Sequence, residues 1–155
     1  YMAAQDGHDE VVAKLIALGA DVDLRDDEGT SPLWIASAAG HDLAVEALIE
    51  AQADVSLADN FGSTPLFAAA QEGRTACARL LLEHGAEAGL SVWAAARQGH
   101  FEVARLLIAH GADVDKPSSD GSTPVKAARA AGYDDVADLL IGAGARDGKL
   151  PFVTA

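Results

Sequence analysis

The feature that most constrains this chain is a short glycine motif that recurs at a nearly fixed interval. Successive copies are separated by 33, 33, 26 and 33 residues. Such a period is the sequence signature of repeat architectures, in which each unit mainly contacts its neighbours. We therefore expect a stack of similar units instead of one core closed by large side chains. The five copies are Gly7-His8, Gly40-His41, Gly73-Arg74, Gly99-His100 and Gly132-Tyr133.

Composition agrees with a folded stack and argues against two kinds of partner. Half of the residues are apolar and 23% are charged, so the chain can bury a core. Eleven basic and 24 acidic residues leave a formal charge of −13, which repels phosphate backbones. We therefore expect no nucleic-acid partner. No apolar run approaches the ~18 residues that suggest a membrane span, so we expect no membrane insertion.

The cysteine content and the start of the chain give two further expectations. Cys77 is the single cysteine and has no partner for an intrachain disulfide. Because disulfides are typical of oxidising compartments, we expect an intracellular, cytoplasmic protein. The first unit lacks the capping Thr-Pro of a full unit, and the chain has no charged-then-apolar leader. We therefore expect Tyr1 to lie inside a helix, with further sequence or repeats ahead of it.

The residues of one unit predict two helices joined by a tight turn. Ser31, Thr64 and Thr123 can cap a first helix with their hydroxyls, and a proline suited to the first helical turn follows each of them. The alanine-rich segments that come next favour helix. A second helix carries an apolar stripe with helical spacing. One such pair cannot bury its own apolar face, so neighbouring pairs must cover it.

This pattern resembles the ankyrin-repeat family over nearly the whole chain. Thr-Pro-Leu, Ala-Ala, Gly-His and Gly-Ala-Asp-Val occur at the family's places in a 33-residue period. The resemblance implies an all-α solenoid of stacked helix-turn-helix units with projecting loops. We expect an ankyrin-repeat domain over residues 1–146. Its expected parts are a partial repeat at 1–25, repeats at 26–58 and 59–91, a repeat at 92–117 with a shortened preceding loop, and a polar, cap-like repeat at 118–146, followed by a tail or linker at 147–155.

Two places depart from the repeat. Gln52 stands where the four other units have glycine, so either its backbone is left-handed or its helix ends differently. The short interval lacks 33 − 26 = 7 residues, and alignment puts the gap between Ala88 and Gly89. We predict that the fourth helical pair stacks normally and lacks only its projecting loop, which leaves a notch in the row of loops.

Repeat register explains the residues that could otherwise suggest chemistry. All five histidines stand at repeat positions beside glycines, and Cys77 takes a slot that holds valine in other units. Acidic pairs fall in loops or on exposed turns without a converging pocket. Neither a phosphate-binding glycine-rich loop nor a cysteine and histidine set with metal spacing occurs. We therefore expect no enzyme activity, no cofactor and no metal site.

One slot near the start of the first helix is occupied by a nearly continuous aromatic row. One interpretation is packing between repeats. The other is that the ring edges reach an inner groove and contribute to a binding site. The row consists of Tyr1, Trp34, Phe67, Trp93 and, in the last unit, Lys126.

The resemblance implies a protein-interaction scaffold that binds a partner protein or peptide through its concave surface of first helices and loop tips. An alternative is a regulatory or targeting segment of a larger enzyme or effector. Because this surface is more acidic than basic, we expect a basic or amphipathic partner. Phe61 needs cover at its loop tip, either from the adjacent loop or from a partner. The expected binding residues are Gln5, Asp6, Asp27, Glu28, Thr30, Asn60, Phe61, Ser63, Gln71, Glu72, Arg97, Gln98, Ser119 and Asp120.

Overall fold

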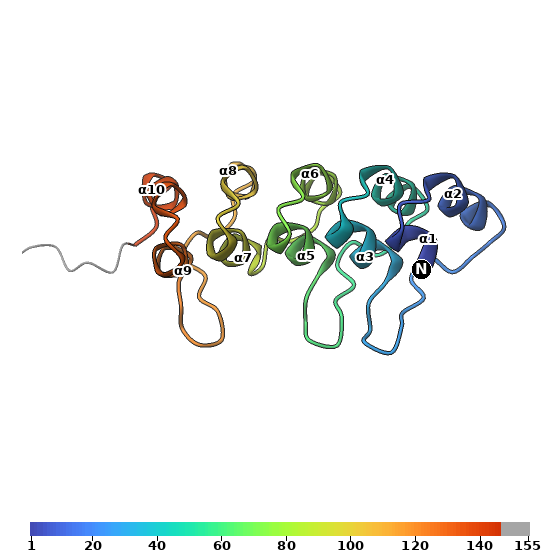
Figure 1. Cartoon of the computed structure of the whole chain (residues 1–155), viewed down its shortest axis with the longest axis horizontal. Helices are drawn as coiled ribbons and strands as arrows, with labels where there is room; N and C mark the ends of the chain where they lie inside the picture. Colours follow the sequence, from blue (N-terminus) through green and yellow to red (C-terminus); the bar gives the residue numbers. More distant parts are fainter. Residues whose placement is uncertain (147–155) are drawn as a thin grey trace, which may run out of the picture.

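The computed structural model describes residues 1–146, which contain ten helices and no strand. The helices form two layers, with the odd-numbered helices in one row and the even-numbered helices in the other (Figure 1). Long loops project from the odd-numbered row, on the side away from the even-numbered row. The expected all-α solenoid is thus confirmed. The helices are α1 Met2–Gln5, α2 Asp9–Ala17, α3 Pro32–Ala39, α4 Asp42–Glu50, α5 Pro65–Gln71, α6 Thr75–Glu83, α7 Ser91–Gln98, α8 Phe101–Ala109, α9 Pro124–Ala131 and α10 Asp134–Gly142.

Hydroxyl side chains cap the three helices that follow a long loop. Ser31 Oγ accepts a hydrogen bond of 3.1 Å from the Trp34 amide, and Thr64 and Thr123 make the same bond at the starts of α5 and α9. These bonds satisfy amides that the first helical turn leaves without partners. The predicted caps are therefore confirmed. Helix α7 starts differently, because its N-cap residue, Leu90, has no hydroxyl to accept such a bond.

Helix α1 is described over Met2–Gln5, directly after Tyr1. The Tyr1 carbonyl accepts the first helical bonds, at 2.9 Å from the Ala4 amide and 3.0 Å from the Gln5 amide. Tyr1 takes the slot of Trp34, which lies inside α3. The expectation that Tyr1 belongs to a helix with further sequence ahead of it stays a prediction.

Neighbouring units stack through small side chains in one layer and leucines in the other. One alanine slot on the odd-numbered helices is fully buried in the second to fifth units, which lets the helices approach closely. A leucine slot on the even-numbered helices is buried in the second to fifth units. The core therefore runs along the length of the stack. These positions are Ala36, Ala69, Ala95 and Ala128, and Leu48, Leu81, Leu107 and Leu140.

The shortened loop leaves the stacking of the fourth unit intact. Helix α7 packs against both α5 and α9, and α8 packs against both α6 and α10. Figure 1 shows the row of loops interrupted ahead of α7, between the loops that precede α5 and α9. The prediction of a normally stacked pair beside a notch is therefore confirmed. Helix α7 starts at Ser91, one residue before the expected fourth unit, and the expected tail at 147–155 lies outside the described residues.

Histidine rings that follow the turn glycines join neighbouring units. His41 Nε2 lies 3.0 Å from the carbonyl oxygen of Gln5, and His100 Nε2 lies 2.9 Å from that of Gln71. Each ring rests on the turn glycine of the preceding unit, so a Cβ atom at Gly73 would lie 2.6 Å from His100 Nδ1. Glycine is needed at this turn for the close contact as well as for its left-handed φ of 70°.

Gln52 adopts the first of the two conformations that the sequence allowed. Its φ is 66°, and it is the only residue other than glycine with a positive φ in the described part of the chain. The Gln52 amide bonds to the Ile49 carbonyl at 2.9 Å, and the Ala53 amide bonds to the Leu48 carbonyl at 3.0 Å. Gln52 thus ends α4 in the way that glycine ends the other second helices, at the cost of a strained backbone.

We expect Gln52→Gly to raise the free energy of unfolding by about 1 kcal/mol, because glycine has no Cβ penalty in the left-handed region. Urea melts would measure the change. Gln52→Ala is the control, since it keeps a Cβ and should stay close to the wild type. A neutral or destabilising effect of glycine at this position would contradict the assigned strain.

The glycine and histidine contact predicts unequal effects of two matched substitutions. Gly73→Ala and Gly85→Ala both put a Cβ on a residue with positive φ, but only Gly73 faces a ring, while nothing lies within 4 Å of the Gly85 position. We expect Gly73→Ala to lower the free energy of unfolding by about 1 kcal/mol more than Gly85→Ala does, because the His100 ring must move from its hydrogen bond. Equal losses in thermal or urea unfolding would rule out a stabilising role for this contact.

Candidate functional site

The loops ahead of α3 and α5 are each folded around an aspartate. Asp26 Oδ1 accepts bonds from the amides of Glu28 at 3.0 Å and Thr30 at 2.9 Å, and Oδ2 accepts a 2.6 Å bond from the Thr30 hydroxyl. Hydrogen bonds from the hydroxyls of Thr30 and then Tyr1 lower the pKa of Asp26 to about 2. Asp59 organises the next loop through the same two amide positions. Both loop tips are therefore ordered by their own hydrogen bonds.

Asn60 ties these two loops together and places their tips side by side. Its amide donates to the Glu28 carbonyl and its Nδ2 to the Asp27 carbonyl, both at 3.0 Å. Its Oδ1 accepts a bond of 3.2 Å from Arg25 Nη2. Phe61, next to Asn60, is 85% exposed. The adjacent loop therefore leaves Phe61 uncovered, although the two loops are bonded to each other.

Two of the expected binding residues turn toward the body of the protein. Thr30 is only 4% exposed, and its hydroxyl lies within hydrogen-bond distance of both Asp26 and the Tyr1 hydroxyl. Its assignment to an exposed surface was therefore wrong, because the loop uses its side chain internally. Ser63 is half-buried, and its Oγ accepts a 3.1 Å bond from Trp34 Nε1. Both side chains hold a loop against the aromatic row.

The aromatic row has two different environments. Tyr1 and Trp34 bond to the loop of the following unit, as packing between repeats would require. Trp93 is also half-buried, but its Nε1 is buried without a hydrogen-bond partner among the described residues. The Arg97 guanidinium lies over the Trp93 ring, 5.3 Å from its centroid. Packing between repeats thus accounts for Tyr1 and Trp34 but leaves the Nε1 donor of Trp93 without a hydrogen bond within the described residues.

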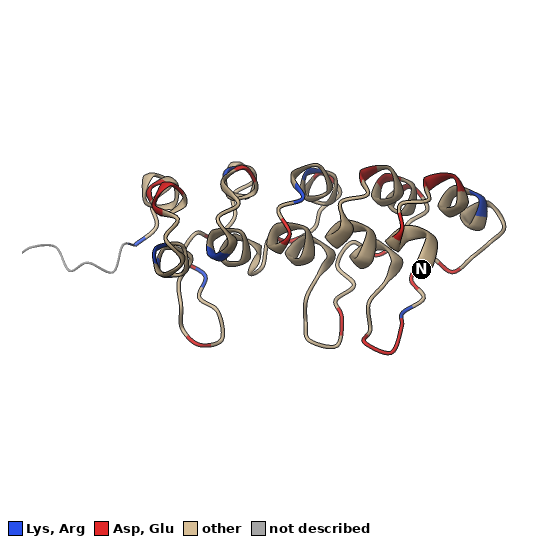
Figure 2. Ribbon diagram, in the orientation of Figure 1, with Lys and Arg blue, Asp and Glu red and all other residues tan. Residues whose placement is uncertain are grey.

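The remaining expected binding residues are exposed but lie in separate groups. The first group lies at the tips of the loops ahead of α3 and α5, and the second lies at the ends of α1, α5 and α7. A third group is at the loop ahead of α9, across the notch from the first (Figure 2). Hydrogen bonds from the Ser118 hydroxyl and the Ser122 amide lower the pKa of Asp120 in this third loop. The groups are Asp27, Glu28, Asn60 and Phe61; Gln5, Asp6, Gln71, Glu72, Arg97 and Gln98; and Ser119 and Asp120.

A hollow of about 350 Å³ lies between α7 and α9. Sequence reasoning placed Arg97 and Asp120 on the binding surface but did not identify this hollow, since it depends on how side chains of different units meet. A sequence signal for the hollow is the alanine pair at the end of α9, because α5 has large polar residues in the same two slots. The lining residues are Trp93, Arg97, Asp120, Ser122, Ala127, Ala130 and Ala131.

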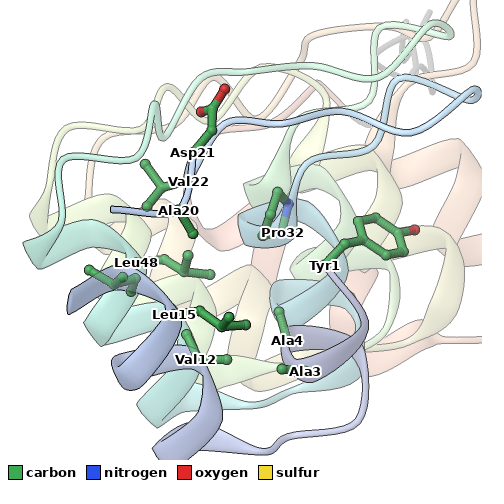
Figure 3. Close-up of a pocket in the computed structure, with 11 residues that line it drawn as sticks. Tyr1, Ala3, Ala4, Val12, Leu15, Ala20, Asp21, Val22, Pro32 and Leu48 are labelled. Carbon is green, nitrogen blue, oxygen red and sulfur yellow. The ribbon is translucent and has the colours of Figure 1, made fainter. Parts of the chain in front are cut away.

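A second hollow, of about 50 Å³, lies at the N-terminal end of the stack (Figure 3). Leu15, one of its lining residues, is 41% exposed, whereas the equivalent leucines of the later units are buried. In those units the preceding helical pair covers this leucine. The hollow is therefore an uncovered packing surface between repeats, and it is small for a ligand pocket.

The groups that could suggest chemistry are used structurally. Cys77 is buried, and burial raises the pKa of its thiol to about 11. His84 and His110 each bond through Nδ1 to a carbonyl in the preceding turn of the same helix. Within residues 1–146 no three His, Cys, Asp or Glu side chains are grouped as metal ligands. No helix in the same range is both long and apolar enough to cross a membrane.

A family model for ankyrin repeats, which contains three copies of the repeat, matches residues 1–92 and 90–149. The two matches together cover nearly the whole chain. No curated protein matches the chain.

The environment of Cys77 predicts slow modification. In the native protein we expect a disulfide reagent to react only as fast as the structure opens, because little thiolate forms below pH 11. In urea the reaction should be immediate. The native state keeps the thiol proton up to about pH 11, whereas the unfolded state loses it near pH 9. The free energy of unfolding should therefore fall as the pH rises from 9 to 11. Urea melts of the wild type and Cys77→Ala across that range would measure the difference, and rapid labelling of native protein at neutral pH would contradict the assignment.

Proposed function

The chain belongs to the ankyrin-repeat family, and from this membership we propose that it binds a partner protein or peptide on the face formed by its loop tips and odd-numbered helices. Ankyrin repeats are generally protein-interaction modules. The observation that carries the proposal is an ordered pair of loops that leaves Phe61 85% exposed. We propose a binding role without catalysis, in an intracellular, cytoplasmic setting that the single reduced cysteine favours.

The rigidity of the loop pair supports this binding face. Asp26, Asp59 and Asn60 already fix the loop backbones in the free protein. A partner therefore has little conformational freedom to remove when it binds these tips. An exposed aromatic ring on such a support is a suitable anchor, because burying it removes apolar surface from water. Phe61 would therefore contribute most to keeping the partner bound.

The charge of the face favours a basic or amphipathic partner. Asp27 and Glu28 stand beside Phe61 in the paired loops, while Asp6 and Glu72 lie at the ends of α1 and α5 and Asp120 in the loop ahead of α9. Arg97 at the end of α7 is the main opposing charge. Arg25, the nearest basic residue to the tips, is bonded to the Gly29 carbonyl and to Asn60. Long-range attraction to a chain with a formal charge of −13 would speed encounter with lysine or arginine residues.

Charge and the aromatic ring should affect different rates. We expect Asp27→Lys with Glu28→Lys to slow association and reduce its dependence on salt, because charge steers encounter. Phe61→Ala should speed dissociation by about tenfold with little change in association, because the ring is buried only in the complex. Stopped-flow or surface-based kinetics with an identified partner would measure both rates.

Matched controls lie on the opposite layer of the stack. Glu46→Lys with Glu83→Lys changes the net charge by the same amount on α4 and α6, and Leu43→Ala removes an exposed apolar side chain of α4. These variants should bind as the wild type does. If the loop-tip variants fold but leave both rates unchanged, the proposed face is wrong. An effect of the controls would place the partner on the even-numbered helices.

A further inference from the structure

The hollow between α7 and α9 is lined on one side by small residues near the end of α9. Ala130 and Ala131 occupy the slots that Gln71 and Glu72 occupy at the end of α5. Alanine keeps the helix but leaves the space of the longer side chains empty. Ala127 adds a third small side chain to the same wall. A recess therefore lies between α7 and α9, because α9 has small side chains in the slots where α5 has large polar ones.

Trp93 forms the opposite wall of the hollow and is held less completely than its counterpart. Trp34 Nε1 donates to Ser63 Oγ at 3.1 Å, whereas Trp93 Nε1 lacks a partner within the described residues although Ser122 takes the slot of Ser63. Arg97 stands in the slot of Ala38 and lies over the ring instead. A buried donor without an acceptor is unfavourable, so the Trp93 ring is held less firmly than the Trp34 ring.

The notch leaves the hollow accessible from the loop side. The loops ahead of α3 and α5 are bonded together through Asn60 and form one wall. The loop ahead of α9 stands apart from them, because the loop that would lie between is absent (Figure 1). Its own bonds are local, from Ser118 and Ser122 to the Asp120 carboxylate. A partner segment can therefore pass between these walls and reach α7.

We propose that an extended, basic peptide segment crosses this notch and inserts one large apolar side chain into the hollow, with a neighbouring lysine or arginine facing Asp120. The proposal rests on the protein-binding function proposed above and assigns the partner's anchor residue to this place. The hollow has a volume of about 350 Å³, near the lower limit of ligand pockets, which range from about 300 to 1,000 Å³. This size suits a side chain more than a cofactor.

The polar groups at the rim fix the orientation of such a segment. Asp120 is an exposed, ionised acceptor for a basic side chain, and Arg97 on the other side can donate to a main-chain carbonyl. Besides the Ser118 hydroxyl, Arg97 also helps to lower the pKa of Asp120 across the rim, so a basic residue of the peptide is attracted by Asp120 and repelled by Arg97. The apolar walls of Trp93 and the alanines then receive the anchor while the polar rim excludes water.

A random peptide library displayed on phage and selected on the whole chain tests this inference. We expect the enriched peptides to share one large apolar residue next to lysine or arginine. Ala130→Gln with Ala131→Glu fills the hollow with the side chains that α5 carries, and should weaken these peptides at least tenfold. Ala38→Gln with Ala39→Glu makes the same change at the end of α3 and should leave their affinity near the wild-type value. Circular dichroism and urea melts would show that both double variants remain folded.

A charge variant gives an independent reading of the same site. Asp120→Asn keeps an oxygen for the loop hydrogen bonds and removes the charge, so we expect it to abolish the preference for peptides with lysine or arginine over those with glutamine. Enrichment of acidic peptides would overturn the proposed orientation. A library without specific binders would overturn the peptide site altogether.

The variants also separate this inference from the function on which it rests. Equal affinity of the selected peptides for the wild type and the Ala130→Gln, Ala131→Glu variant would overturn the assignment to the hollow. If those peptides are still weakened by Phe61→Ala or by the Asp27 and Glu28 charge reversals, the binding face stands and only the anchor position is wrong. If none of these changes alters affinity, both proposals fail.

Discussion

The structure depends on the close stacking of helical pairs that cannot bury their own apolar faces. Alanine in the odd-numbered row lets the helices approach, and leucine in the even-numbered row fills the space between units. The turn glycines serve the same contact, because a ring such as His100 rests on Gly73 and bonds to the unit before it. Each unit is therefore stable only through its neighbours, and stability spreads along the stack instead of residing in one centre.

This dependence on neighbours explains how much of the fold the sequence could predict. Capping at Ser31 and the normal stacking of α7 each follow from residues within one repeat or from its register. The sequence left two conformations open at Gln52, and the structure has the left-handed one. The inward turn of Thr30 did not follow, because it depends on side-chain hydrogen bonds to Asp26 and Tyr1 that the repeat register does not indicate. The hollow beside Trp93 was missed for the same reason, since its walls belong to two units and to the loop between them. The repeat register predicts the position of a residue in the fold, but it does not predict which side chains of other units that residue contacts.

Departures from the repeat are where this chain can acquire specificity. Positions that keep the repeat have a structural task, as Ser31 and the turn glycines show, and a change there destabilises the stack. One slot at the loop tips, which holds Glu28, Phe61 and Asp120, is exposed in all three loops, so its side chain can differ between units. Glu28, Phe61 and Asp120 share one slot and differ completely in charge and size. One scaffold therefore presents an acidic, an aromatic and a second acidic position in a fixed order.

The missing loop is tolerated because loops contribute less to the stack than helices do. The contacts of α7 with α5 and α9 are made by the helices themselves, so the absent loop forfeits bonds such as those of Asn60 without opening the core. What remains is a difference in surface shape, since the row of loops is interrupted ahead of α7 (Figure 1). A solenoid can therefore lose a loop and gain an opening at one unit, and the loss of stability is confined to that unit. The same locality means that a partner bound at the notch would stabilise mainly the third, fourth and fifth units, and would leave the first unit as free to open as before.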